Sequence, residues 1–136
     1  MSKALTKDAI LGVKDRELKK VKVPEWGGFV FLRELSGKER FDLQNRMVEI
    51  AEAARKKGLK DDEELGVEIV KGGARGELLT RCLCDQDGDL LFKAEDIFRL
   101  EEKNNNVIQR LFDLASEMNG MSDDEVNEEE KKAAKN

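Results

Sequence analysis

The chain has no histidine and no tyrosine, and it has only one proline, one tryptophan and two cysteines in 136 residues. Histidine is the most common general base and tyrosine is a common proton donor, so these absences argue against an enzyme. Cys82 and Cys84 are too close in sequence for an unstrained disulfide, and a zinc site would lack two further ligands. We therefore expect no catalytic residue, no metal site, no cofactor, and two reduced cysteines.

The sequence also lacks a long apolar run and an excess of basic residues. No stretch approaches the ~18 apolar residues of a membrane span, and residues 1–20 are too charged for the apolar part of a secretory signal. Acidic residues outnumber basic ones by 30 to 25, whereas a nucleic-acid groove favours a basic excess and exposed aromatic side chains. We therefore expect a soluble cytoplasmic protein that binds neither a membrane nor nucleic acid.

The composition changes near the end of the chain. Residues 1–120 fit a single domain with its own core, since a chain of this size buries about two-thirds of its unfolded surface. Residues 121–136 contain six acidic residues and three lysines but no Leu, Ile, Phe or Trp. They hold too little apolar surface to order themselves. We predict a disordered acidic C-terminal tail, which either keeps the protein soluble or docks on a partner.

The single proline and the single tryptophan lie together between two extended-looking runs. Residues 18–23 alternate valine with lysine, which is the period of a half-buried strand, and residues 29–32 are continuously apolar. Between them the segment Pro-Glu-Trp-Gly-Gly favours a tight turn. We predict an antiparallel β-hairpin over about 18–34. Its Trp26 either packs back on the core or stands exposed as an anchor for a partner.

Helical periodicity follows the hairpin and predicts helices over about 37–57, 61–84, 94–103 and 105–119. The first of them opens with a capping box, in which Ser36 and Glu39 satisfy each other's backbone donors. Before the third, Asp87 and Gly88 predict a turn, because the acidic residues there have the wrong register for a calcium loop. The predicted fold is α+β, mainly α-helical, with a small N-terminal antiparallel β-hairpin.

The predicted helix over 61–84 carries four glycines, and three of them, Gly72, Gly73 and Gly76, lie close together. Two of them, Gly72 and Gly76, continue the helical spacing that begins with Leu65 and Ile69. Each glycine inside a helix costs about 1 kcal/mol relative to alanine. Either the helix kinks or breaks near Gly72 and Gly73, or another backbone packs closely there. Such a close contact between subunits would favour a homo-oligomer.

The order of these motifs carries a resemblance to a known family. A lysine-rich strand and P-E-W-G-G are followed by V-x-L-R-E-L-S-G-x-E-R and a long helix. Next come C-D-x-D-G-x-L-L-F, an E-D-I helix, a last helix closing on N-G, and an acidic tail ending in K-N. This succession, from about Lys19 to the end of the chain, resembles the tail assembly chaperones of long, non-contractile-tailed (lambda-like) bacteriophages.

The resemblance implies a function. Such a protein is expected to bind the tape measure protein in the host bacterial cytoplasm, to keep its long apolar helices soluble, and to recruit the major tail tube protein, whose polymerisation displaces the chaperone. It would be absent from the mature virion. We expect several copies to bind one tape measure protein, each holding a helix in an apolar groove.

Seven residues are candidates for partner binding. They are exposed-looking aromatic or basic residues around the hairpin and the inward positions of the glycine-bearing helix, namely Trp26, Phe29, Arg33, Leu65, Ile69, Gly72 and Gly76. For Arg33 and Arg40 an alternative stays open, because both could pair locally with Glu34 or Glu39 instead of with acids of a neighbouring subunit.

Other functions compete with this one. A structural head-to-tail connector or tail-completion protein would remain in purified virions, where mass spectrometry would find it. An acidic mimic of nucleic acid would carry its carboxylates along one face, but acids and bases are interleaved here outside the tail. The family also often makes a longer product by ribosomal frameshifting, and codons for Ala134-Lys135-Asn136 can contain a slippery heptamer. Only the nucleotide sequence decides that point.

Overall fold

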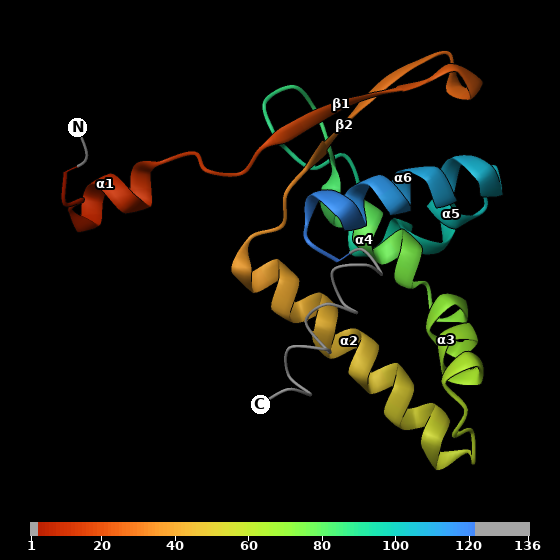
Figure 1. The fold of residues 1–136 in the computed structure, drawn as a ribbon. Coiled ribbons are helices and arrows are strands. Elements are labelled where there is room, and N and C mark those ends of the chain that lie inside the picture. Colours follow the sequence, from red (N-terminus) through yellow and green to blue (C-terminus); the bar gives the residue numbers. More distant parts are fainter. Residues whose placement is uncertain (1–2, 122–136) are drawn as a thin grey trace.

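The computed structural model describes residues 3–121 and confirms the predicted α+β class. A small sheet lies over α4, α5 and α6, while α2 and α3 extend away from that group and α1 stands apart at the N-terminal end (Figure 1). The elements are α1 (Lys7–Gly12), β1 (Leu18–Val23), β2 (Gly28–Arg33), α2 (Gly37–Lys56), α3 (Asp62–Lys71), α4 (Ala74–Cys82), β3 (Leu83–Cys84), α5 (Ile97–Glu101) and α6 (Asn105–Met118).

The hairpin forms where the sequence predicts it. β1 and β2 pair antiparallel, with Val21 opposite Val30. The turn is a single turn of 3-10 helix, Pro24–Trp26, and it closes on Gly27, whose φ of 77° suits a residue without a Cβ. Strand β3 then pairs with the other side of β2, which the sequence did not predict. The strand order β1-β2-β3 therefore leaves β1 at one edge.

Helix α4 is the centre of the core. It packs against α5, α6 and β2. The fully buried side chains come mainly from α4 and α6, with others from the sheet, and they include Leu32, Leu78, Leu79, Ile108 and Leu111. Burying one such side chain contributes about 1.5–3 kcal/mol, so this cluster stabilises the group on which the sheet rests.

Helix α2 starts with the predicted capping box. The Ser36 hydroxyl accepts from the backbone N–H of Glu39 at 3.1 Å, and the Glu39 carboxylate accepts from the backbone N–H of Ser36 at 2.9 Å. Along its length α2 buries only Leu43 and Ala54. It packs mainly on α3, and the two helices form an arm that extends from the core (Figure 1).

The prediction of one helix over 61–84 is wrong. α3 ends at Lys71, and Gly73 takes a left-handed conformation with φ of 90° before α4 begins. The last two residues, Leu83 and Cys84, leave the helix because they pair with β2. The chain therefore breaks at the glycines, as one of the two predicted alternatives requires.

The other alternative, close packing, also occurs, and it occurs within one subunit. An ideal Cβ on Gly72 would lie 2.7 Å from Cδ1 of Ile50 in α2. An ideal Cβ on Gly76 would lie 2.7 Å from the carbonyl oxygen of Ile97 in α5. Gly72 therefore lets the end of α3 approach α2, and Gly76 lets α4 approach α5, more closely than any other residue would allow.

The remaining segments agree closely with the sequence. The region predicted as a helix over 94–103 holds a 3-10 turn, Ala94–Asp96, followed by α5, and α6 lies within the predicted 105–119. The predicted Asp-Gly turn is present, with Gly88 at φ 87°. Its geometry is held by Asp85, whose side chain accepts from the backbone N–H groups of Asp87 and Asp89.

Helix α1 was not predicted. Thr6 caps it by accepting from the backbone N–H of Ala9 at 3.2 Å, and none of its residues is buried. None of the helices within residues 3–121 is long and apolar enough to span a membrane. Apart from Met121, the predicted acidic tail over 121–136 lies outside the described residues.

Both cysteines are free and buried in the core. Burial raises the pKa of the Cys82 thiol to about 12 and also raises the pKa of Cys84. Reactive cysteines act as thiolates, so these two thiols serve as small core residues at neutral pH.

Candidate functional site

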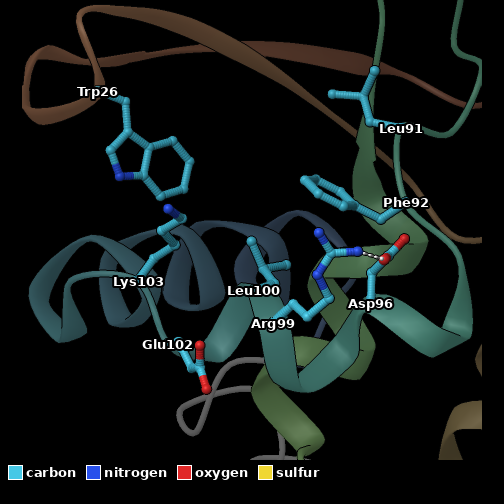
Figure 2. A pocket seen from close by; sticks show the side chains of 8 residues that line it. All are labelled: Trp26, Leu91, Phe92, Asp96, Arg99, Leu100, Glu102 and Lys103. Atoms are coloured by element: carbon cyan, nitrogen blue, oxygen red, sulfur yellow. Dashed lines mark hydrogen bonds and ion pairs between the residues drawn. The ribbon is translucent and has the colours of Figure 1, made fainter.

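A groove of about 780 Å³ lies between the tip of the hairpin and α5 (Figure 2). Three segments line it: the hairpin turn, the loop after the Asp-Gly turn, and α5 with the residues just before and after it. Its lining residues are Trp26, Leu91, Phe92, Asp96, Arg99, Leu100, Glu102 and Lys103.

The walls and the floor of the groove are apolar. Figure 2 shows the Trp26 indole on one side and the Phe92 ring on the other, with Leu100 between them on the α5 side. Trp26 is 38% exposed and Leu91 is 55% exposed, whereas Leu100 is buried. Phe92 packs partly against the core. The groove therefore offers exposed apolar surface on a support that the core holds in place.

The rim on the α5 side is charged. Arg99 pairs with Asp96 at 3.2 Å, three residues earlier on the helical turn. The side chain of Lys103 points toward Trp26 from the end of α5 (Figure 2). The rim thus holds both signs of charge beside an apolar floor, which is the pattern of a surface that accepts an amphipathic segment.

The hairpin tip is tied down beside the groove. Glu25, which precedes Trp26, accepts two hydrogen bonds from Arg110 of α6, at 2.9 and 3.0 Å. These bonds lower the pKa of Glu25 to about 2. The ion pair links the hairpin turn, one residue before Trp26, to α6.

A second exposed surface lies on the outer face of the hairpin. The rings of Phe29 and Phe31 meet edge to face with their centroids 5.6 Å apart, and Lys20 Nζ lies 4.1 Å from the Phe29 ring centroid. A hollow of about 350 Å³ beside these rings reaches Asp85 and Leu91. Phe29 is 53% exposed, so this face combines aromatic surface with positive charge.

Arg33 lies inside the protein. It is 8% exposed, and its guanidinium donates to the carbonyl oxygens of Arg81 and Gly88 and to the carboxylate of Glu39. Arg40 donates to the carbonyl oxygen of Asn119. For Arg33 the sequence left open a local ion pair or a pair with a neighbouring subunit, and the structure shows the local pair with Glu39.

The structure does not bring the seven predicted residues together. Trp26 lines the groove and Phe29 lies on the outer face of the hairpin. The others are packed inside the molecule or between its helices: Arg33, Leu65, Ile69, Gly72 and Gly76. A partner-binding role for these residues stays a prediction.

Sequence reasoning missed most of the groove. It did not single out Leu91, Phe92 or Leu100, nor the charged rim from Asp96 to Lys103. The sequence did contain one indication of the groove: the Leu-Leu-Phe run after the Asp-Gly turn is more apolar than a solvated loop. Within residues 3–121 no group of His, Cys, Asp and Glu side chains could hold a metal ion.

Comparison with known proteins places the chain in a family. The family model described as phage tail assembly chaperone matches residues 6–134. The solved structure of the bacteriophage HK97 tail assembly chaperone is similar, with a TM-score of 0.53 and 25% identity, and the match covers 80% of this chain and 88% of that chain. No curated protein matches the sequence. The resemblance in the order of motifs is confirmed, and the chain belongs to the phage tail assembly chaperone family.

Proposed function

We propose that this tail assembly chaperone binds the tape measure protein of its phage and holds amphipathic helices of that protein in the groove between the hairpin tip and α5. Family membership implies a non-enzymatic role and partners among phage tail proteins. The groove itself carries the finer proposal, because Trp26, Leu91 and Leu100 offer an apolar floor next to charges of both signs.

The groove fits a helix better than a small molecule. An amphipathic helix places apolar anchors every three or four residues along one face, and Trp26 and Phe92 stand on opposite sides of the groove, where such anchors would enter (Figure 2). The charged side of the same helix would face Arg99 and Lys103. No covalent step is required, so binding is reversible.

Many weak binding sites along one long partner explain both how the chaperone stays bound and how each copy is released. If several copies bind a single tape measure protein, the overall affinity exceeds that of any one copy, yet each copy dissociates singly. We propose that major tail tube subunits are recruited to this complex and displace the copies as the tube grows. The chaperone then acts in the host bacterial cytoplasm and is absent from the mature virion.

Trp26→Ala tests the groove. Aromatic anchors at the centre of an interface typically contribute 2 kcal/mol or more, so we expect the variant to bind the tape measure protein on the order of 30-fold more weakly. On co-expression, most of the tape measure protein should move from the soluble to the insoluble fraction. Binding is measured by titration calorimetry with a soluble tape measure fragment.

Phe41→Ala is the matched control. Phe41 is also an exposed aromatic residue, 60% accessible on α2, but it does not line the groove. It should bind like the wild type. Equal binding by the wild type and by correctly folded Trp26→Ala, as judged by circular dichroism, would show that the helix binds elsewhere.

We also propose that the protein forms a homo-oligomer through α1. Helices shorter than about 12 residues are marginal in water unless they pack on something, and α1 has six residues, none of them buried. The apolar side chains of Ile10 and Leu11 in α1, and of Val13 just after it, are all exposed, Leu11 by 74%. A second copy of the chain would supply the surface that this helix lacks in one molecule.

The double variant Ile10→Asp/Leu11→Asp tests this contact. We expect its mass by light scattering to fall to that of one 15.4 kDa chain, while the wild type is larger at the same concentration. Val48→Asp, at an exposed apolar position of α2, should keep the wild-type mass. A monomeric wild type, or a double variant with the wild-type mass, would contradict this role of α1.

A further inference from the structure

The outer edge of β1 is open within residues 3–121. β1 is the edge strand of the sheet, and its side chains Lys19, Lys20 and Lys22 are exposed. None of the ion pairs within the described residues includes these three lysines. Edge lysines by themselves discourage pairing between sheets, but here they accompany exposed apolar side chains, including Phe29.

The lysines flank the edge on both faces of the sheet. Lys20 pairs with Phe31 and Lys22 pairs with Phe29 in the register of the hairpin. Because side chains alternate along a strand, Lys20 and Lys22 share the outer face while Lys19 lies on the other. A chain segment that runs along this edge would meet positive charge on both sides.

The described part of the chain ends beside the start of this strand. The side-chain oxygen of Asn119 accepts from the backbone N–H of Leu35 at 2.8 Å. The neighbouring Glu34 donates its backbone N–H to the carbonyl oxygen of Glu17 at 3.1 Å, and Glu17 immediately precedes β1. The last described residues therefore lie near the segment that leads into β1.

The sequence that follows has the complementary charge and a sufficient length. Residues 123–130 hold six carboxylates and no basic residue. Eight extended residues span up to about 26 Å, whereas the six-residue strand β1 is about 20 Å long. Attachment so close to the edge gives the segment an effective concentration on the order of millimolar.

We propose that residues 123–130 bind along the open edge of β1 in the same molecule, with their carboxylates against Lys19, Lys20 and Lys22. The bound segment covers the free edge, so it prevents pairing with another sheet. It also covers part of the face that holds Phe29. Since the contact is electrostatic, salt weakens it, and a more acidic partner displaces it. This inference is independent of the proposed groove.

Backbone amide chemical shifts measured by NMR test the contact. We expect the amides of β1 to shift when the chain is shortened to end at Met121, and the synthetic peptide 122–136 to restore the shifts when added to the shortened chain. The difference between the two chains should vanish in about 0.5 M salt, where the screening length is only a few ångströms. It should not change on dilution.

Charge reversal supplies the matched comparison. In Lys19→Glu/Lys20→Glu/Lys22→Glu, shortening the chain should leave the amides of β1 unchanged. A second triple variant carries the charge reversals at Lys56, Lys57 and Lys60, at the exposed far end of α2 and just beyond it. In this variant, shortening the chain should still shift the amides of β1. The proposal is overturned if shortening the wild type leaves β1 unchanged, if the shifts survive in the first variant, or if they appear only at high protein concentration.

Discussion

Arg33→Met is expected to lower the free energy of unfolding by about 3–5 kcal/mol, the typical cost of removing one partner of a buried ion pair. Methionine keeps much of the apolar stem, so the loss comes from the guanidinium. That group donates to the Glu39 carboxylate and to the carbonyl oxygens of Arg81 and Gly88. The variant would take one donor from each of these three acceptors, and Glu39 would keep only the exposed Arg16 and the backbone N–H of Ser36. Urea unfolding followed by circular dichroism measures the change.

Arg16→Met is the control for this effect. Arg16 also pairs with Glu39, at 2.9 Å, but its side chain is largely solvated. Solvated ion pairs contribute about 0–1 kcal/mol, so Arg16→Met should cost less than 1 kcal/mol. Similar losses for the two variants would mean that burial does not set the strength of the Glu39 pair and that Arg33 is not the internal link between β2, α2 and the Asp-Gly turn.

Gly76→Ala should also destabilise the fold, by about 1–3 kcal/mol, which is the usual cost of forcing an extra methyl group into a packed site. The added Cβ would lie 2.7 Å from the carbonyl oxygen of Ile97. That atom belongs to the backbone of α5, so relief requires α4 and α5 to move apart. The backbone N–H of Gly76 also donates to the Glu101 carboxylate at 2.9 Å, and separation would lengthen that bond. Thermal unfolding should show a drop of several degrees.

Gly66→Ala is the matched control, because the same substitution there should act in the opposite direction. Gly66 lies inside α3, and a Cβ at this position would meet no atom within 4 Å. Alanine is favoured over glycine in a helix by about 1 kcal/mol, so this variant should be more stable than the wild type. If both substitutions stabilise the protein, the contact between α4 and α5 is looser than the structure shows.

The contact at Gly76 also affects the shape of the groove. Gly76 sets the distance between α4 and α5, and Arg99 and Leu100 of α5, with Lys103 just beyond its end, line the groove. A separation of α4 from α5 would therefore move one wall of the groove relative to Trp26, whose hairpin turn is joined to α6 by the exposed Glu25–Arg110 ion pair. The shape of the groove therefore depends on the packing of α4 against α5 as well as on the residues that line it.

Local signals in the sequence were sufficient for several elements. The alternation of valine and lysine predicts β1, the Pro-Glu-Trp-Gly-Gly segment predicts the turn, and Ser36 with Glu39 predicts the start of α2. Each of these patterns depends on residues only a few positions apart, so the element can be predicted without knowing any tertiary contact. The order of such patterns also pointed to the family.

Tertiary structure decided the rest. Leu83 and Cys84 leave the helical pattern because β2 offers them hydrogen bonds, and Arg33 is internal because Glu39 and two distant carbonyls surround it. The groove joins Trp26 to residues more than sixty positions later in the chain. Burial, pairing and concavity depend on which segments meet, and a single sequence does not contain the distances between segments that are far apart along it. Composition and local patterns therefore determined the class of the protein, while packing determined which of its residues are buried and which line the groove.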